Sequence, residues 1–316
     1  MIEGPLFLAI CVSSFLVVFI SLPPLIRRLE EIGSVKTDYH KNSSRKVACP
    51  GGLAILLGYF FGSVLTGLLG LNESSLLLIA FVTVLGAVVG LVDDLLSFKK
   101  ATIICFTILM GLPLWAFYQG GTVIDTFFWG LIDIGILYLP LSILGISFLS
   151  NAVNIYSPLN GLESGLAFIT CTGLTVCAIL YHSMESAISL AIMASCLLAF
   201  LRWNIYPSEI FLGNIGTYMI GSLIASAIIA GSIKVAGIIA CFPYFLNFFL
   251  RTWDRFEKFT ADTTEDGLIV TSKPGTLWSL FILNKPRHER TVVIFSWIIQ
   301  ATFSLTAIFY SLIRNP

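Results

Sequence analysis

Long apolar runs separated by short polar intervals dominate this 316-residue chain. A helix needs about 20 mainly apolar residues to cross a bilayer. Helices are expected because a segment inside hydrocarbon must satisfy its own backbone hydrogen bonds. The pattern therefore predicts an all-α polytopic membrane protein with about ten transmembrane helices. They are expected at residues 5–25, 51–70, 75–96, 101–118, 127–150, 161–181, 184–201, 210–231, 234–252 and 291–313.

Composition supports the same class. Hydrophobic residues make up 57% of the chain, and the mean hydropathy is +0.92. The alternating segments of about ten residues that mark a transmembrane barrel are absent. The sequence indicates no separate soluble domain, so residues 1–316 are expected to form one membrane domain. The longest interval without a span is a loop at about residues 251–290.

The formal net charge of zero hides an uneven distribution. Arg27 and Arg28 directly follow the first apolar run, which favours an outside amino terminus. Ten spans then place the odd-numbered loops, with nearly all Lys and Arg residues, in the cytoplasm. We expect the cell membrane if the source is archaeal and the endoplasmic reticulum if it is eukaryotic, with a cytoplasmic active site. Every polytopic protein shows such a bias, so it does not by itself indicate a function.

Asp93 and Asp94 end the third predicted span. A carboxylate at bilayer depth costs roughly 2.5–3.5 kcal/mol of insertion free energy. Two adjacent carboxylates therefore indicate either a function or a neutralising partner. Neighbouring helical residues point about 100° apart, so at most one of the two can face a ligand directly. Hard oxygen ligands suit Mg²⁺, and the pair therefore indicates metal or phosphate chemistry. The alternative is an interfacial pair neutralised by Lys99 and Lys100.

A second polar segment runs from Asn151 to Gly165. Asn151 and Asn154 are three residues apart and would share one face of a helix. Pro158 and Gly161 should break that helix, and Glu163 would then open the next span near its positive end. Amide oxygens and a helix amino terminus suit metal and phosphate, but turn and capping chemistry explains the same residues equally well.

A third segment, NIYPSEIFLGNIG, precedes the eighth predicted span. Ser208 is a candidate helix cap. Phe211 is followed by Gly213 and Asn214, and a glycine there would allow close backbone approach to a ligand. On these residues alone, an ordinary helix start is favoured over a binding site.

Several enzyme classes lose support from missing motifs. Seven cysteines form no CxxC pair and three histidines lack ligand spacing, which argues against a disulfide framework or a zinc site. The chain has no phosphate loop of the GxxxxGK[ST] type, no HExxH and no GxSxG. NTP hydrolases of that type, zinc proteases and serine hydrolases are therefore not favoured.

Together, the segments resemble the polyprenyl-phosphate N-acetylhexosamine-1-phosphate transferases, glycosyltransferase family 4. NAVNIYSPLNGLESG resembles the motif NAxNIxxGxNGLExG of the dolichyl branch, and NIYPSEIFLGN resembles its NWYPSxVFxGD. DIGILY at Asp133 and HER at residues 288–290 also look like that branch. The resemblance extends from about Asp38 to the last predicted span.

The resemblance implies a reaction and its partners. The family transfers N-acetylglucosamine-1-phosphate from UDP-GlcNAc to a polyprenyl (dolichyl-type) phosphate in the bilayer and releases UMP, the first step of lipid-linked oligosaccharide synthesis in protein N-glycosylation. Mg²⁺, or Mn²⁺ in its place, is the implied cofactor. No nucleic acid partner is expected, and whether the chain forms a homodimer is open.

The resemblance also implies roles for individual residues. Asn154 and Asn214 would bind the metal, Asp93, Asp94 and Lys100 would take part in the chemistry, and Phe211 would stack on uracil. Substrate contacts would come from the remaining polar candidates, which are Asp38, Lys41, Asn151, Asn160, Glu163, Arg251, Arg255, His288 and Arg290. Direct in-line attack by the lipid phosphate is favoured, with Asp93 or Asp94 as a base or as a group that orients the metal.

Two departures from the family pattern leave alternatives open. Asn214 stands where the FxGD motif has an aspartate, so the site loses one formal charge, and the Arg-His-Arg cluster of the ninth loop is not visible. One alternative is a weakly active homologue or one with another UDP-sugar donor. Another is a transporter or channel, although such proteins often show inverted repeats, which are not apparent here. The polyprenol length is not indicated.

Overall fold

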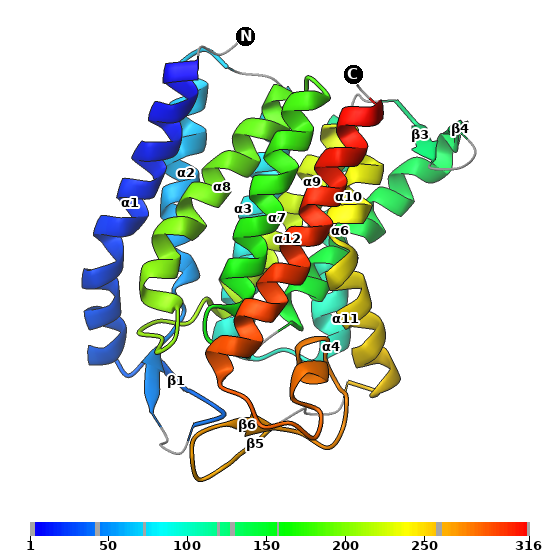
Figure 1. Cartoon of the computed structure of the whole chain (residues 1–316). Coiled ribbons are helices and arrows are strands. Elements are labelled where there is room, and N and C mark those ends of the chain that lie inside the picture. Colours follow the sequence, from blue (N-terminus) through cyan, green and yellow to red (C-terminus); the bar gives the residue numbers. More distant parts are fainter. Residues whose placement is uncertain are drawn as a thin grey trace.

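The computed structural model describes residues 4–41, 45–71, 74–118, 121–126, 130–156, 158–256 and 261–314. Helices stand side by side in one bundle, and both termini lie at the same end of it (Figure 1). The opposite end, called the loop end below, carries strands β1, β5 and β6 and the first turn of α12 (Figure 1). Termini at the same end are what an even number of crossings requires.

Twelve α-helices are present among the described residues. Their bounds are α1 Gly4–Glu31, α2 Gly52–Leu68, α3 Ser74–Leu96, α4 Lys100–Leu109, α5 Leu112–Phe117, α6 Tyr138–Asn154, α7 Leu162–Leu180, α8 Met184–Asn204, α9 Gly213–Ala230, α10 Lys234–Ala240, α11 Phe242–Trp253 and α12 Glu289–Arg314. Two 3₁₀ helices lie at Gly135–Leu137 and Trp278–Ile282.

Three antiparallel two-stranded hairpins accompany the helices in the described part of the chain. They pair β1 (Val35–Thr37) with β2 (Lys46–Ala48), β3 (Val123–Thr126) with β4 (Gly130–Asp133), and β5 (Asp262–Thr263) with β6 (Ile269–Val270). The prediction of an all-α chain is therefore confirmed for the bundle and incomplete for its loops.

Among the described residues, seven helices are long and apolar enough to cross a membrane, as expected of an integral membrane protein. An eighth crossing results if α10 and α11 form one span bent by 58°. Pro243, at the start of α11, lacks an N–H and clashes with a preceding helical turn, which explains the break. Two shorter apolar helices, Gly52–Leu68 and Lys100–Trp115, coincide with the second and fourth predicted spans. The count of ten remains a prediction.

The predicted end of the first span and the predicted start of the fifth are wrong. Helix α1 continues to Glu31, six residues beyond the predicted end at 25. The span expected at 127–150 begins with hairpin residues, and α6 starts only at Tyr138; residues 127–129 lie outside the described part. The span expected at 210–231 is present as α9, which starts at Gly213, within three residues of the prediction. Ser208 does not cap it, because its hydroxyl donates to the backbone oxygen of Ile210, at 2.8 Å.

Helix α9 lies at the centre of the bundle and brings the polar segments together. It packs mainly on α3 and α6, and most of its side chains are buried. A Cβ at Gly90 of α3 would lie 2.2 Å from the backbone oxygen of Asn214, so only glycine permits this approach. Asp93 and Asp94 follow Gly90 by one turn, which places them beside the start of α9.

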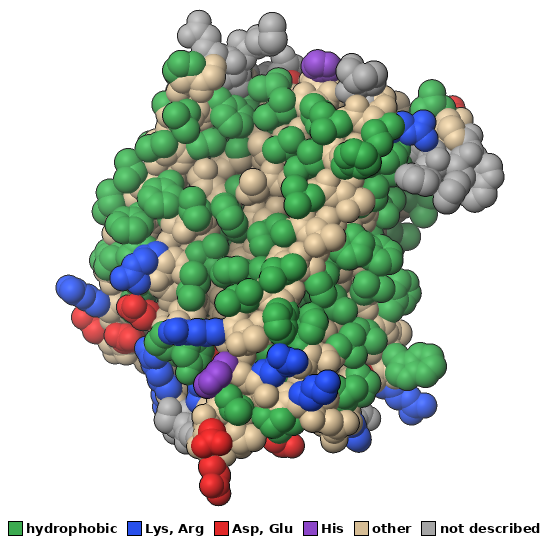
Figure 2. Space-filling model, viewed as in Figure 1, with side chains coloured by type: hydrophobic (Ala, Val, Ile, Leu, Met, Phe, Trp, Pro, Cys, Tyr) green, Lys and Arg blue, Asp and Glu red, His purple; other side chains and the backbone are tan. Residues whose placement is uncertain are grey.

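The surface agrees with this arrangement. In Figure 2, hydrophobic side chains cover the helices, while Lys, Arg, Asp and Glu side chains gather mostly at the loop end. The uneven charge distribution predicted from the sequence is therefore present in the folded chain. The side of the membrane that this end faces remains a prediction.

Candidate active site at the loop end of the bundle

The last turn of α3 meets the first turn of α9 through the Asp93 carboxylate. Asn214 Nδ2 donates to Asp93 Oδ2 at 2.7 Å, and the backbone N–H of Phe98 donates to Asp93 Oδ1 at 3.0 Å. Asp93 is 9% exposed and lines a cavity. A carboxylate that faces an amide and an open cavity is available to a ligand.

Asp94 points in another direction. Its Oδ1 accepts from Lys36 Nζ at 2.9 Å, and its Oδ2 accepts from the backbone N–H of Ile215 at 3.0 Å. The positive end of α9 therefore supports the negative charge of Asp94. Among the described residues, Asp93 lines a cavity and Asp94 does not, so the two carboxylates point apart as their adjacency on a helix predicted. Contact of Asp93 with a ligand stays a prediction. The proposed neutralisation by Lys99 and Lys100 is not seen in the described residues, because the cation is Lys36.

Gly213 is required for this contact. Its φ is +75°, in the left-handed region that favours glycine. A Cβ there would lie 2.8 Å from Asp94 Oδ2 and 2.5 Å from Pro50 Cβ. The sequence analysis expected a glycine that allows close approach at this position, and here the approaching atoms belong to the protein itself.

Asn154, the last residue of α6, is anchored on α9 one turn beyond Asn214. Its Oδ1 accepts from Thr217 Oγ1 at 2.7 Å, and its Nδ2 donates to Tyr218 Oη at 3.1 Å. Residues near positions 94, 154 and 214 are thus in one place, as the sequence predicted, although they come from three separate helices.

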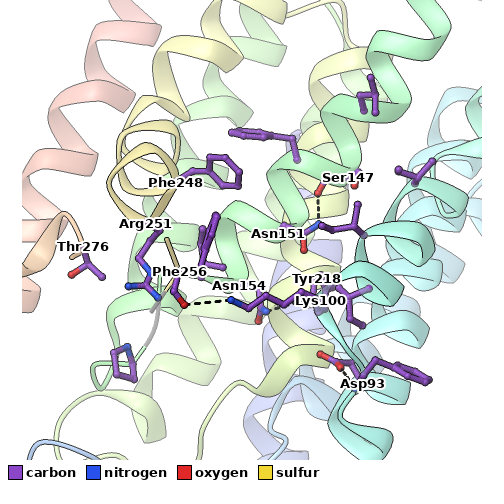
Figure 3. A pocket seen from close by; sticks show the side chains of 18 residues that line it. Asp93, Lys100, Ser147, Asn151, Asn154, Tyr218, Phe248, Arg251, Phe256 and Thr276 are labelled. Atoms are coloured by element: carbon purple, nitrogen blue, oxygen red, sulfur yellow. Dashed lines mark hydrogen bonds between the residues drawn. The ribbon is translucent and has the colours of Figure 1, made fainter. Parts of the chain in front are cut away.

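A cavity of about 760 Å³ opens beside these residues. Its walls, from α4, α6 and α11, are mainly aliphatic and aromatic, and include Ile103, Ile104, Ile108, Leu144, Phe148 and Phe248. Lys100, Asn154 and Arg251 extend into the same region from different helices (Figure 3). We call this space the apolar cavity.

Both cations of the apolar cavity, Lys100 and Arg251, have partners within the protein. Lys100 Nζ donates to the backbone oxygen of Phe256 at 3.3 Å, and Arg251 pairs with Asp254 at 3.1 Å. Asn151 also lines the cavity, as its spacing from Asn154 predicted, and its Nδ2 donates to Thr107 Oγ1 at 3.0 Å.

A second cavity, of about 280 Å³, lies on the other side of Asn154. It is lined by Lys36, Glu163, Asn204, Phe211 and Asn214, among others, and we call it the polar cavity. Asn154 and Pro158 line both cavities. The two spaces therefore meet at the side chain for which the resemblance implies a metal ligand.

Charge states in the polar cavity are constrained by burial. Burial raises the pKa of the Cys49 thiol to about 12, so this wall residue stays a neutral thiol near pH 7. Burial opposes the charge on Lys36, but the carboxylates of Asp94 and Glu163 outweigh it and raise the pKa of the ammonium group. Lys36 is therefore a fixed cation at the boundary of the cavity.

Three predicted substrate residues lie in a separate buried network instead. Asn160 Nδ2 donates to Asp38 Oδ1 at 3.1 Å and to Glu289 Oε1 at 2.7 Å, and Lys41 pairs with Glu289. Asp38 and Asn160 are each 2% exposed. Substrate contact by these residues stays a prediction, and their positions show that they join loops to one another.

Three further candidates lie away from both cavities. Within the described residues, Arg255, His288 and Arg290 line neither space. Arg290 instead donates to the backbone oxygen of Tyr206 at 3.0 Å and stacks over its ring. Sequence reasoning missed Lys36 and Glu289. Lys36 lies in the first predicted cytoplasmic loop and Glu289 in the HER triplet, but nothing local in the sequence indicates their partners.

Metal binding by the chain alone would be incomplete. The described residues contain no group of three or more His, Cys, Asp or Glu side chains arranged to hold a metal. The oxygen atoms near Asn154 include the Asp93 carboxylate of the apolar cavity, the Glu163 carboxylate of the polar cavity and the amide oxygens of Asn154 and Asn214. Such a set fits a magnesium ion that shares its coordination with substrate phosphates, which is how Mg²⁺ is often bound.

Comparison with known proteins agrees with the motifs. Residues 76–232 match the family model described as glycosyl transferase family 4. A phospho-N-acetylmuramoyl-pentapeptide-transferase of Halalkalibacterium halodurans is 30% identical over 258 residues, which cover 76% of this chain and 79% of the relative. The chain belongs to glycosyl transferase family 4. The matched region contains Asp93, Asn154 and Asn214.

Two archaeal relatives match over greater lengths. A Sulfolobus acidocaldarius protein is 29% identical over 309 residues, 95% of this chain and 94% of the relative. A Saccharolobus solfataricus protein is 29% identical over 301 residues, 93% of this chain and 94% of the relative. Both carry the provisional name UDP-N-acetylglucosamine–dolichyl-phosphate N-acetylglucosaminephosphotransferase. The family predicted from the sequence motifs is therefore confirmed.

Proposed function

We propose that this protein transfers N-acetylglucosamine-1-phosphate from UDP-GlcNAc to a polyprenyl (dolichyl-type) phosphate in the membrane and releases UMP. The observation that carries the proposal is the pair of cavities, one apolar and one polar, that meet at Asn154. A reaction between a lipid and a nucleotide sugar needs two such binding sites side by side. The provisional names of the archaeal relatives supply the substrate class.

The apolar cavity would hold the first isoprene units of the acceptor. Its aliphatic and aromatic walls suit a hydrocarbon chain, and burial of apolar surface stabilises such a complex by roughly 25 cal/mol per Å². Lys100 and Arg251 would contact the lipid phosphate at the polar end of the cavity. A lipid tail held in this way confines the phosphate to one plane beside Asp93.

The polar cavity would hold the nucleotide. Phe211 supplies an aromatic face for uracil, since rings bury large surfaces and stack well. Glu163 would supply an acceptor group for the base or ribose. Lys36 would supply a positive charge beside the diphosphate of the nucleotide sugar.

Asp93 and the amide oxygens of Asn154 and Asn214 would hold Mg²⁺, or Mn²⁺, together with the donor diphosphate. The ion would supply charge neutralisation, which phosphoryl transfer needs more than covalent help. Asp94, already paired with Lys36 and the α9 amino terminus, would keep the end of α3 in place.

The chemical step is a direct displacement. An oxygen of the lipid phosphate attacks the β-phosphorus of UDP-GlcNAc, and the bond from that phosphorus to the bridging oxygen breaks. The electron pair leaves with UMP, and the product is a lipid-linked diphosphate sugar. The chain's contribution is alignment of the two phosphates and exclusion of water by the apolar walls. Asp93 would orient the attacking phosphate or accept its proton.

The test is UMP release by the purified chain with UDP-GlcNAc and a short polyprenyl phosphate, with and without Mg²⁺. We expect turnover that needs both substrates and falls at least about 100-fold in Asp93→Asn, because an electrostatic contact at the reacting phosphate is removed. Asp133→Asn is the matched control, since that carboxylate is exposed on β4 at the other end of the bundle. Solute flux in liposomes without UMP release would instead support a transporter. UMP release with another UDP-sugar, and none with UDP-GlcNAc, would show that the proposed sugar donor is wrong.

A further inference from the structure

The first turn of α12 carries a buried carboxylate that the sequence analysis did not single out. Glu289 is 5% exposed. Its Oε1 accepts from the backbone N–H of Asn160 at 2.6 Å and from Asn160 Nδ2 at 2.7 Å. Its Oε2 pairs with the ammonium group of Lys41. One side chain thus holds two loops that are far apart in the sequence.

Asn160 extends the connection to two more points. Its second amide hydrogen goes to Asp38 Oδ1, at 3.1 Å, and its Oδ1 accepts from the backbone N–H of Ser208 at 3.0 Å. The loop between α6 and α7 is therefore joined to the loop after β1 and to the segment before α9. Both donors and the oxygen of the Asn160 side-chain amide are hydrogen-bonded, which leaves it little freedom to move.

All three joined segments form walls of the polar cavity. Leu159 and Glu163 flank Asn160, Phe211 follows Ser208, and Lys36 precedes Asp38. Among the described residues, Glu289 and Asn160 themselves do not line this cavity. Their hydrogen bonds fix the relative positions of the three segments that form its walls.

We propose that Glu289 is a positioning residue that sets the shape of the nucleotide site through Asn160 and does not touch either substrate. This rests on the function proposed above. Charge-assisted hydrogen bonds are shorter and stronger than neutral ones. Two donors of Asn160 converge on one carboxylate oxygen, so the removal of that oxygen leaves both without their acceptor inside a buried network.

Two variants separate the parts of the contact. Glu289→Gln keeps an acceptor oxygen for the two Asn160 donors and loses the charge that faces Lys41, whereas Glu289→Ala loses both. Glu185→Ala is the matched control. Glu185 also lies in the first turn of a helix, α8, and no side-chain partner is recorded for it among the described residues. An effect that comes only from the loss of a negative charge at a helix amino terminus would also be seen in Glu185→Ala.

The first readout is steady-state kinetics of the full chain in detergent or nanodiscs. For Glu289→Ala we expect the KM for UDP-GlcNAc to rise about tenfold or more, because a small misplacement of binding groups is costly. The KM for polyprenyl phosphate should stay within about twofold, since the apolar cavity shares only two residues with the polar one. Glu289→Gln should recover most of the loss. Equal rises in both KM values, or no recovery by Gln, would overturn the proposal.

The second readout does not need activity. Hydrogen exchange of residues 158–165 should be faster in Glu289→Ala than in the wild type and the Glu185→Ala control, because the Asn160 N–H loses its acceptor. Unchanged exchange there would overturn the positioning role. Absence of UMP release by the wild-type chain would instead refute the proposed function, and the exchange measurement would still decide the role of Glu289.

Discussion

Replacement of Asn214 by aspartate turns an attractive contact into a repulsive one unless a cation lies between the two groups. In the wild type, Asn214 Nδ2 donates to Asp93 Oδ2 at 2.7 Å. An ionised aspartate has no hydrogen to donate, so two carboxylates would face each other. The variant would also restore the aspartate of the FxGD motif that the sequence lacks.

The expected cost follows from this contact. Loss of a hydrogen bond to a charged acceptor is worth about 1.5–3 kcal/mol. Two like charges about 4 Å apart repel by about 4 kcal/mol at an effective dielectric of about 20. Protonation of one carboxylate relieves part of the repulsion. We expect the metal-free Asn214→Asp variant to lose about 2–4 kcal/mol of stability, which is a fall of several degrees in Tm.

Magnesium should reverse the sign of this effect. A cation that binds the folded state and not the unfolded chain raises Tm, and added negative charge in the site strengthens its binding. The assay is thermal unfolding of both proteins in EDTA and in a Mg²⁺ series. Asn284→Asp is the control, because Asn284 is exposed and, among the described residues, lines neither cavity. An equal Mg²⁺ response in wild type and Asn214→Asp would refute the placement of the metal at these two residues.

Three other predictions concern the loops. Asn160→Asp would face two buried carboxylates with a third and should lower the free energy of unfolding by at least about 2 kcal/mol; an unchanged Tm would contradict the described network. Burial lowers the pKa of His40, so the unfolded chain binds more protons than the folded one below about pH 6.5. Tm should therefore be flat above that pH and decrease below it, and His40→Gln should flatten the profile; equal slopes in both proteins would count against a buried neutral imidazole. Lys46 is exposed in β2 at the loop end, and Lys46→Cys should add a label from a membrane-impermeant maleimide only when the cytoplasmic side is open. Labelling from outside would invert the predicted topology.

The positions of most helices could be predicted because apolar runs report them directly. The helices α7, α8 and α12 begin and end within three residues of the predicted spans. The pairing of Asn151 and Asn154 on one cavity could also be predicted, since a spacing of three is a local property of a helix. Local geometry was sufficient for both.

The β3–β4 hairpin could not be predicted in the same way. Leu131 and Ile132 are apolar, and a short apolar run fits a strand or a helix equally well. In the structure both side chains are exposed, and Leu131 is 75% exposed. Hydropathy alone therefore extended the predicted span into a segment that does not belong to the helix.

The partners of the aspartate pair show where local patterns stop being informative. Adjacency on a helix established that Asp93 and Asp94 point apart, but not which of them faces the cavity. That choice depends on α9, which approaches α3 at Gly90 and presents the Ile215 N–H to Asp94 and the Asn214 amide to Asp93. Lys36, 58 residues before Asp94, completes the neutralisation. Asp94 is thereby bonded to a cation and a helix amino terminus. Asp93 accepts only from neutral donors in the described residues and lines the apolar cavity, where its charge can serve a substrate or a metal.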